Sequence, residues 1–294
     1  MKIYSLVNSL LSTIESNLSE NPTADSLSEG LYISSVHLQR LFKASFDITL
    51  ASYIRSRKLA MSLNNLMNLN WSIADIAAEF GFDHSQSYIR AFKKEFSITP
   101  GEVRKNGMIV EIKPPIKLLP TNELADGLLF GPKIVYVPGF HCVGRSRSIP
   151  SGADATVPAN AALDFWFGGD MEKVQNRKAP DTYIGLTKFI KNNCSFTTYT
   201  SSVHVSNLSA IPDGFEGNTI PSGQYIRFHY IGNHPYEEIN ADVAKGMYDT
   251  IENYNYDKDS GLGLLYDYYF EKIIPAECDN NYCKMEWFAP VFEK

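Results

Sequence analysis

Apolar residues recur at spacings of three and four along most of the N-terminal third of the chain, and this pattern predicts helices almost throughout. Pro22 interrupts the pattern early and marks a break between two helices. The pattern ends near Lys105, and a stretch without a clear period then runs from Lys113-Pro114-Pro115 to Gly131-Pro132. We therefore predict an all-α domain of about seven helices over residues 1–107 and a linker over residues 108–130.

Residues 131–294 alternate short β-rich runs with helical ones. The order strand–helix–strand–strand occurs twice, first with a helix over residues 159–177 and then with one over residues 235–252. The expected strands are Ile134–Val137, Thr182–Phe189, Phe196–Val205, Gln224–Tyr230, Gly263–Ile273 and Cys283–Phe288. This repetition predicts an α+β domain built from a duplicated β-α-β-β unit, so the chain as a whole is multi-domain.

Two helix-turn-helix patterns occupy the predicted helical domain. In the first, which spans Thr23–Lys43, Ser34 or Ser35 can cap a helix with one apolar face. In the second, Gly81 permits the turn before a helix over His84–Lys94. The polar faces left over suit a DNA groove, because arginine and glutamine can read bases and lysine can contact phosphate. The residues predicted to contact DNA are Ser35, Val36, Gln39, Arg40, Lys43, Arg55, Ser85, Gln86, Ser87, Arg90, Lys93 and Lys94.

A helix expected over Leu50–Leu69 joins the two patterns. Reading helices that enter consecutive major-groove segments lie about 34 Å apart, and a helix of about 20 residues spans about 30 Å. The spacer therefore suits one molecule that bridges two groove segments, and we expect a monomer on DNA. The alternative, that these are solvated helix faces without a partner, explains one such pattern better than it explains two in tandem.

The net charge of −6 does not exclude DNA binding. Residues 1–107 contain 11 Lys+Arg and 10 Asp+Glu, whereas the remainder contains 16 and 23. The helical domain is thus close to neutral, and the C-terminal domain holds the excess of acid. Because phosphate binding depends on local basic clusters rather than on a basic total, double-stranded DNA is the expected partner of the helical domain.

The segments HLQRLFKASFDITLASYIRSRKLAMSLNNL and SIADIAAEFGFDHSQSYIRAFKKEFSITPGEVR resemble the AraC/XylS family of transcription regulators, especially its MarA/SoxS/Rob branch. The resemblance covers about 90 residues, through HLQR-x-FK, YIRSRK and GF-x(4)-S-x(2)-R-x-FK. It implies binding to asymmetric promoter sites, contact with RNA polymerase and a role as an activator. Val36 stands where the branch has a bulky aromatic residue, and Ser97 stands where many members have glycine. The target sequence of the branch therefore should not be transferred to this chain.

Aromatic residues and carboxylates alternate in the C-terminal domain. Because alternate residues of a strand share a face, Asp267, Tyr269 and Glu271 are expected on one side of the strand Gly263–Ile273. A carboxylate within an aromatic wall suits a lipophilic cation, to which each ring contributes about 0.5–2 kcal/mol. We expect a small cationic or amphipathic effector, and the alternative is that the rings are core and the acids are solvated. The predicted ligand-binding residues are Trp166, Tyr225, Asp267, Tyr269, Glu271, Trp287 and Phe288.

Three segments of this domain, Lys133–Gly139, GQYIRFHYIGNHPYEEI and MEWFAPV, resemble the GyrI-like effector-binding domain over roughly residues 130–294. The resemblance implies a duplicated β-α-β-β fold with a pocket between its halves, here placed after the AraC-type domain. Members often have an acid followed by x-Tyr on the penultimate strand. Asp267-Tyr268-Tyr269 fits that position with Asp where Glu is usual, and Glu271 is the other candidate acid.

Two other functions of the C-terminal domain stay open. A small-molecule hydrolase would use Glu271, Glu286 or Asp267 as a general base, although no Ser-His-Asp or Cys-His order is evident. A protein-interaction module would bind polymerase or another protein without any small ligand. A dry aromatic pocket favours a ligand, whereas a filled core beneath an exposed aromatic patch favours a protein partner.

The remaining features argue against other chemistry. The four cysteines form no CxxC pair and the histidines are scattered, so we expect reduced thiols, no metal site and no cofactor. No apolar run approaches the about 20 residues of a membrane span, and the N-terminus has no signal-peptide pattern. We therefore expect a cytoplasmic protein with no membrane partner, and the AraC/XylS resemblance implies a bacterial protein at the nucleoid.

Overall fold

The computed structural model describes residues 2–68, 70–118, 122–124, 127–150, 153, 156–189, 195–239, 242–247, 262–264 and 267–293. Two compact units, Ile3–Leu119 and Pro120–Lys294, make up the chain, and each is described by itself. In these ranges, no helix is both long and apolar enough to cross a bilayer.

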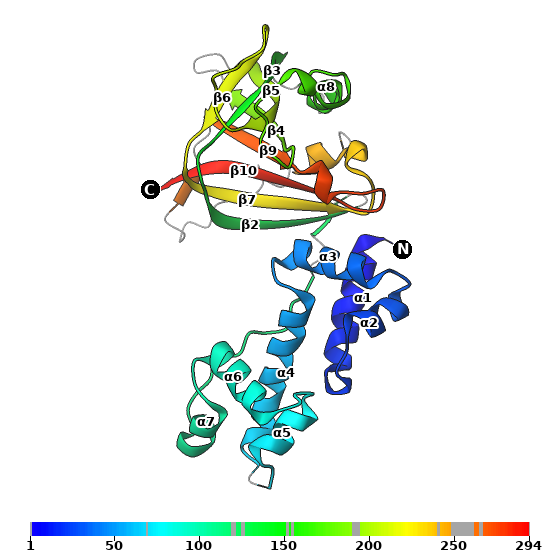
Figure 1. The fold of residues 1–294 in the computed structure, drawn as a ribbon, viewed down its shortest axis with the longest axis vertical. Coiled ribbons are helices and arrows are strands. Elements are labelled where there is room, and N and C mark those ends of the chain that lie inside the picture. The colour runs from blue at the N-terminus through cyan, green and yellow to red at the C-terminus, as the bar shows by residue number, and fades with distance from the viewer. Residues whose placement is uncertain are drawn as a thin grey trace. The chain divides into compact units, whose positions relative to one another are not determined.

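The first unit is helical, as predicted (Figure 1). The pairs α2–α3 and α5–α6 are the two helix-turn-helix motifs, and α4 joins them. The helices of this unit are α1 (Ile3–Ser16), α2 (Ala24–Leu31), α3 (Ser35–Phe46), α4 (Leu50–Leu66), α5 (Ile73–Glu79), α6 (Ser85–Phe96) and α7 (Pro100–Asn106).

Helices α3 and α6 are two copies of one structural element. Each has 12 residues, and the chain leaves each through a residue in the left-handed region, Asp47 with φ 62° and Ser97 with φ 63°. The side chains of Thr49 and Thr99 then cap the helix that follows. Ser97 therefore makes the left-handed turn that glycine makes more readily, because serine pays the steric cost of its Cβ there.

The segment that follows α7 packs on the helical unit instead of forming a free linker. The Ile116 backbone N–H donates to the Tyr53 hydroxyl at 3.1 Å, and Arg57 Nη1 donates to the Lys113 carbonyl at 3.0 Å. The second unit also starts earlier than residue 131, because its strands include Glu123–Leu124 and a strand that begins at Gly127. The predicted linker over residues 108–130 thus belongs largely to the two units themselves.

The second unit is an antiparallel sheet with helices on one face (Figure 1). Its strands run in the order β1-β2-β7-β10-β9-β4-β5-β3-β6, and β8 pairs with β10. The elements are β1 (Glu123–Leu124), β2 (Gly127–Val137), β3 (Phe140–Pro150), α8 (Thr156–Phe167), β4 (Tyr183–Phe189), β5 (Phe196–Val205), β6 (Glu216–Ile220), β7 (Gly223–Gly232), a helix over residues 242–247, β8 (Leu262–Leu264), β9 (Tyr268–Ile273) and β10 (Cys283–Glu293).

The strand order confirms the predicted duplication. The first half is β3-α8-β4-β5 and the second is β7, the helix over residues 242–247, β9 and β10. In each half the last strand lies between the other two, and β4 and β9 meet at the centre of the sheet. Phe165 of α8 packs against the first half, and Val243 and Met247 pack against the second. The helix-covered face is therefore a two-part core with β4 and β9 between the parts.

Several predicted boundaries differ from the structure. The helix expected over residues 159–177 starts at Thr156 and ends at Phe167, because Gly168 and Gly169 follow it. Of the helix expected over residues 235–252, Tyr236–Glu238 is a 3₁₀ turn and residues 242–247 are α-helical, while residues 240–241 and 248–252 lie outside the described part. Among the described strands, β1, β3 and β6 were missed by the sequence pattern.

Candidate functional site

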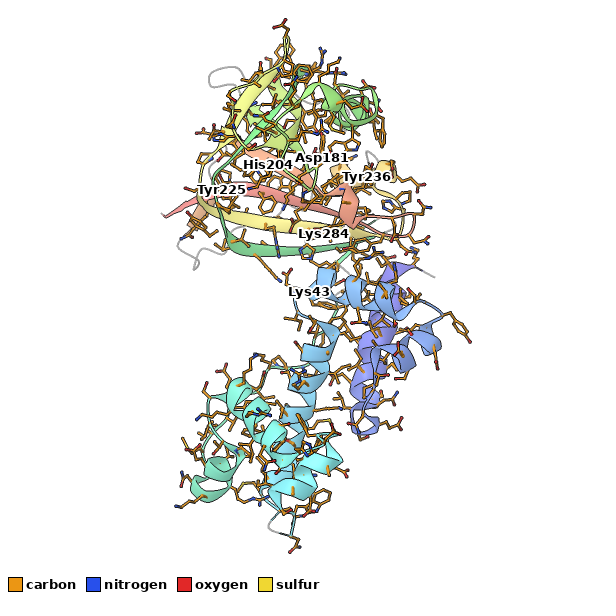
Figure 2. All side chains as sticks on the ribbon, in the orientation of Figure 1. Lys43, Asp181, His204, Tyr225, Tyr236 and Lys284 are labelled. Atoms are coloured by element: carbon orange, nitrogen blue, oxygen red, sulfur yellow. The ribbon has the colours of Figure 1, made fainter. Side chains whose placement is uncertain are left out.

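All the side chains predicted to contact DNA remain accessible. Arg40 is half-buried, as are Ser35, Ser85 and Ser87. Val36 is 73% exposed, and the others that are exposed are Gln39, Lys43, Arg55, Gln86, Arg90, Lys93 and Lys94. Figure 2 labels Lys43, near the end of α3. The apolar residues of the same helices face inward, so each helix buries one side and leaves the polar side to solvent.

The equivalence of α3 and α6 extends to their basic residues. Counting from the first residue of each helix, Arg40 and Arg90 occupy the same position, and so do Lys43 and Lys93. Arginine and then lysine one turn later is a pattern suited to a base edge and the adjacent phosphate. The helical unit therefore presents the same pair of cations twice.

Helix α4 holds the second motif at a fixed place. Ser62 Oγ and the Tyr88 hydroxyl are hydrogen-bonded at 2.9 Å, and Ser56 donates to Glu95 at 2.8 Å. Burial raises the pKa of Tyr88 to about 12, so this hydroxyl stays protonated at neutral pH. With 17 residues, α4 is about 25 Å long. It is shorter than the expected Leu50–Leu69 helix, although the spacer still separates the two motifs.

In the second unit, the predicted ligand residues divide between the two faces of the sheet. Trp166 and Glu271 line one cavity on the helix-covered face, and Tyr269 and Trp287 pack in the core beside it. Tyr225 and Phe288 belong to a separate apolar cluster on the opposite face. In Figure 2, Tyr225 is labelled at the left of this unit and Tyr236, which lines the cavity, at the right.

This division corrects the predicted single site. Trp287 and Phe288 are neighbours on β10, so their side chains must point to opposite faces. Asp267 is exposed in the turn before β9 and lies outside the cavity. Of the two candidate acids, Glu271 is therefore the one that reaches the cavity.

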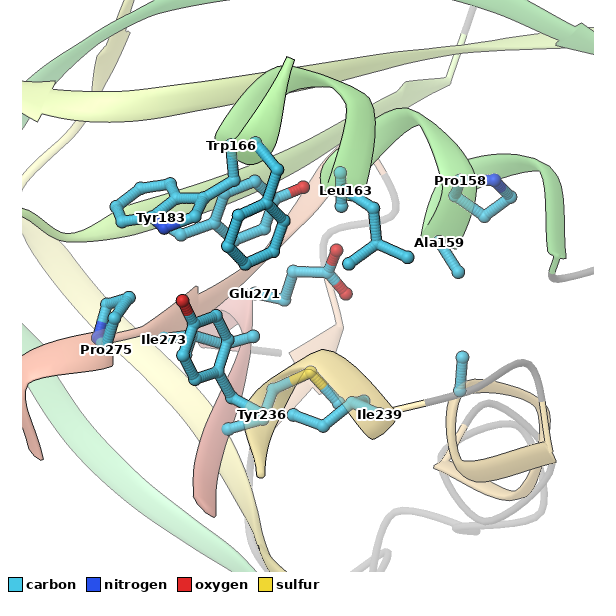
Figure 3. Close-up of a pocket in the computed structure, with 14 residues that line it drawn as sticks. Pro158, Ala159, Leu163, Trp166, Tyr183, Tyr236, Ile239, Glu271, Ile273 and Pro275 are labelled. Atoms are coloured by element: carbon cyan, nitrogen blue, oxygen red, sulfur yellow. The ribbon is translucent and has the colours of Figure 1, made fainter. Parts of the chain in front are cut away.

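The cavity, called here the Glu271 pocket, lies between the two halves of the unit (Figure 3). Trp166 and Phe167 come from α8, and Tyr236 and Ile239 come from the second half. The rings of Phe167 and Tyr236 stack with centroids 6.2 Å apart. The cavity volume is about 70 Å³, so a ligand larger than a few water molecules requires the cavity to widen.

A chain of hydroxyls holds the carboxylate of Glu271 at the base of the pocket. Tyr199 donates a hydrogen bond to Glu271 Oε1, and the hydroxyls of Tyr183 and Tyr199 are 2.7 Å apart. Burial raises the pKa of Glu271 to about 7, although the hydrogen bond from Tyr199 acts in the opposite direction. Burial and the charge of Glu271 also raise the pKa of Tyr183 and of Tyr199. Both tyrosines therefore remain donors, and Glu271 is poised to ionise when a positive charge approaches.

Gly185 makes room for this arrangement. It lies opposite Glu271 in the β4–β9 pairing, and a Cβ built on it would be 2.2 Å from Glu271 Oε1 and 2.6 Å from the Tyr199 hydroxyl. Sequence reasoning missed Gly185, Tyr183, Tyr199 and Tyr236. The alternation of Tyr183 and Gly185 along β4 was visible, but Tyr199 comes from β5 and Tyr236 from a 3₁₀ turn. The pairing of β4 with both β5 and β9 is a tertiary fact that no local pattern contains.

Three further groups bear on other chemistry, namely the possible general base Glu286, potential metal ligands and the cysteines. Burial would raise the pKa of Glu286, but Lys284, Lys272 and Arg227 outweigh it and lower that pKa, which disfavours Glu286 as a general base. Among the described residues, no group of three or more His, Cys, Asp or Glu is placed to hold a metal ion. Within the described part of the chain, Cys142, Cys278 and Cys283 are not in a disulfide, and Cys194 lies outside that part.

Comparisons with known proteins show what the helical unit is similar to. A helix-turn-helix domain family matches residues 27–106. The probable transcription factor PqrA of Proteus vulgaris is 36% identical over 104 residues, which cover 35% of this chain and 85% of that protein. The transcriptional regulator Rob of Salmonella typhimurium is 35% identical over 115 residues, which cover 38% of this chain and only 40% of that protein. The solved structure of SAV2435 bound to tetraphenylphosphonium is 14% identical with a TM-score of 0.44, and covers 55% of this chain and 94% of that one.

Proposed function

The chain belongs to the AraC/XylS family of helix-turn-helix transcription regulators, and on this premise we propose that it binds duplex DNA as a monomer and responds to a small cation. The observation that supports DNA binding best is the repeated pair of basic residues, Arg40 with Lys43 on α3 and Arg90 with Lys93 on α6. Each pair lies on an accessible helix face, and α4 separates the pairs within one compact unit.

Selection from a random duplex library, followed by hydroxyl-radical footprinting of the selected site, tests this proposal. A monomer that inserts α3 and α6 into consecutive groove segments protects two stretches about 10 base pairs apart, on one face of the duplex. The stoichiometry is then one chain per site. A single protected stretch, or two chains per site, would refute the proposed docking.

An activating role and contact with RNA polymerase, both implied by the family resemblance, are further parts of the proposal. In vitro transcription from a template that carries the selected site upstream of a weak promoter tests them. More transcript with the parent than with a variant that cannot bind the site supports activation. Less transcript would make the chain a repressor.

The sensing function rests on the Glu271 pocket. Trp166, Phe167, Tyr183 and Tyr236 surround one buried carboxylate whose pKa is raised to about 7. A cation that enters this pocket stabilises the ionised form of Glu271, while the rings stabilise the cation. A permanently charged quaternary ammonium ion fits this chemistry, because its methyl groups satisfy the rings and it needs no hydrogen-bond acceptor.

Calorimetric titration with choline and with its neutral isostere 3,3-dimethylbutan-1-ol tests the pocket, and benzyltrimethylammonium and tetrabutylammonium extend the size range. We expect the charged compound to bind about tenfold or more tightly than its isostere. Glu271→Gln should abolish the difference, whereas Glu172→Gln, which changes an exposed acid outside the pocket, should preserve it. Equal binding of choline and the isostere would exclude a cation site.

The protein-interaction alternative predicts a filled core beneath an exposed aromatic patch. The pocket instead combines a small cavity with a buried acid, which supports the ligand proposal. The hydrolase alternative requires turnover of the bound compound, and incubation of the parent with a bound ester followed by product analysis distinguishes it from simple binding.

A further inference from the structure

A second and larger cavity lies on the opposite face of the sheet from the Glu271 pocket. Its volume is about 710 Å³, within the range of about 300–1,000 Å³ that small-molecule sites usually have. The wall comes from the β2–β3 hairpin around Pro138, and the base comes from β4, β7, β9 and β10. Because strand side chains alternate, none of the residues that line this cavity lines the Glu271 pocket. We call it the Lys272 groove.

The charge of the groove is opposite to that of the Glu271 pocket. Lys178, Arg227 and Lys272 line it, and Glu286 is the one Asp or Glu among its described lining residues. The Glu286 carboxylate lies 3.3 Å from Arg227 Nη1, 3.6 Å from Lys272 Nζ and 3.1 Å from Lys284 Nζ. One carboxylate therefore faces three cations, of which Arg227 and Lys272 line the groove, and Lys178 adds a third positive charge to the lining.

The positive charges of the groove lower the pKa of two ionisable groups, Glu286 and His204. The nearby cations lower the pKa of Glu286 in spite of its burial. Burial lowers the pKa of His204, and the charges of Lys178, Lys272 and His141 lower it further. Lys178, Lys272 and His141 line the groove together with His204. An anion bound among them would relieve this repulsion.

The base of the groove is aromatic. Phe270 and Phe288 stack with centroids 4.7 Å apart, and Phe140 meets Phe270 edge-on at 5.5 Å. His204 contacts Phe140 in turn, with ring centroids 5.1 Å apart. Cations along the rim and rings along the base together match a molecule with an apolar body and one negative end.

We propose that the Lys272 groove is a second ligand site, which takes an amphipathic carboxylate with its ring on Phe270 and Phe288 and its anionic end at Lys272, Arg227 and Lys178. An inorganic anion would leave the apolar base unused, and a neutral apolar compound would leave the net positive charge of the groove lining unchanged. The two faces of the sheet then bind ligands of opposite charge. This site is independent of the proposed cation sensor, because it uses none of the residues of the Glu271 pocket.

The test compares three probes of one shape with the full chain, 4-phenylbutyrate, 4-phenylbutan-1-ol and 4-phenylbutylammonium, by calorimetry at pH 7.5. The carboxylate should bind about tenfold or more tightly than the alcohol. In the Glu271→Gln variant, which removes the proposed cation site, the ammonium ion should bind more weakly still. In NMR spectra, the ring signals of His204 should shift with 4-phenylbutyrate. Signals of Trp166, which lines the Glu271 pocket, should not.

Variants distinguish binding in the Lys272 groove from general attraction of an anion to surface charge. Lys272→Gln should weaken 4-phenylbutyrate about fivefold or more, and Lys178→Gln, which changes an exposed residue, should weaken it in the same direction. Lys173→Gln, an exposed lysine outside the groove, should leave the affinity unchanged, and so should Glu271→Gln. Equal affinity for the three probes, or shifts at Trp166 instead of His204, would overturn the proposal. An acidic peptide that binds where 4-phenylbutyrate does not would assign the groove to a protein partner instead.

Discussion

Glu271 and Gly185 lie opposite each other at the centre of the sheet, and the space that Gly185 leaves empty holds the Glu271 carboxylate. A Cβ on Gly185 would be 2.2 Å from Glu271 Oε1, closer than such atoms can approach. The strand pairing fixes both backbones, so a Cβ on Gly185 would have to be accommodated by displacement of the Glu271 side chain. The acid of the proposed sensor is thus positioned by a residue without a side chain.

Gly185→Ala should accordingly displace the carboxylate and impair cation binding. We expect a loss of about 1–3 kcal/mol in the free energy of unfolding from overpacking, with weaker choline binding in the same variant. Urea unfolding and calorimetry measure the two effects. Gly30→Ala is the matched control, because a Cβ at Gly30 meets nothing within 4 Å and lies in helix α2. It should raise stability by about 0.5–1 kcal/mol, and a tolerated Gly185→Ala would refute the steric argument.

The raised pKa of Glu271 predicts an unusual pH dependence. The pKa of Glu271 is about 7 in the folded chain and 4.5 for the ordinary side chain of the unfolded chain, so the folded state favours the protonated form. The stabilising contribution is complete below pH 4.5 and is lost as the pH rises through 7, by up to about 3 kcal/mol. Comparing the parent with Glu271→Gln by urea unfolding at pH 6 and pH 8 isolates it. The variant should gain stability relative to the parent at pH 8, and a constant difference would contradict the pKa shift.

Cation affinity should follow the same ionisation. At pH 6 most of Glu271 is protonated, and at pH 8 most of it is ionised. Choline should therefore bind about tenfold more tightly at pH 8 than at pH 6, with proton release that is largest at the lower pH. Titrations in buffers of different ionisation enthalpy measure the released protons. An affinity that does not change with pH would mean that the cation does not sense Glu271.

The repeated basic pairs predict matched effects on DNA binding. Arg40→Ala and Arg90→Ala should each weaken binding to the selected duplex by about 1–3 kcal/mol if both arginines read bases. Lys43→Ala and Lys93→Ala should instead reduce the slope of log affinity against log salt by about 1 each. Fluorescence anisotropy over a salt series distinguishes the two effects, with Lys105→Ala on α7 as the control. Parent-like binding by both arginine variants would show that α3 and α6 are not the reading helices.

The ion pair between Arg57 and Glu15 should stabilise the helical unit without contacting DNA. Arg57 donates to both carboxylate oxygens of Glu15, at 2.9 Å and 3.0 Å, with only 12% of the Arg57 side chain exposed. Glu15→Ala leaves that guanidinium partly unpaired and should cost about 1.5–3 kcal/mol in the free energy of unfolding. Chemical unfolding measures the loss. A change below about 0.5 kcal/mol would place this pair with ordinary surface ion pairs.

Sequence reasoning succeeded where a residue's role follows from its own periodicity. The inward Leu38 and Phe42, the outward Gln39 and Arg40, and the turn at Gly81 all follow from helical spacing and backbone preference. The faces of β9 also followed from alternation, since Tyr269 and Glu271 lie on the helix-covered face and Phe270 lies on the other.

The Glu271 pocket could not be predicted from periodicity, because it depends on which strands are neighbours in the sheet. Tyr199 reaches Glu271 only because β4 lies between β5 and β9 and contributes Gly185 there. The predicted site grouped Trp287 with Phe288 on aromatic content alone. Alternation along β10 places the two side chains on opposite faces of the sheet. The charge pattern did not predict the Lys272 groove either, since its basic residues come from β7, β9 and the segment before β4 in an acidic half of the chain.

The proposed link between ligand and DNA can be measured most directly by titrating the selected duplex with the full chain at pH 8, with and without saturating benzyltrimethylammonium. A ligand-responsive regulator requires different ligand affinities in the free and DNA-bound states, so the DNA affinity must change, typically by about 5- to 150-fold. The account predicts such a change in the parent and its loss in Glu271→Gln, while Glu172→Gln behaves like the parent. An unchanged DNA affinity in the parent, at a concentration where calorimetry shows the pocket to be occupied, would contradict it.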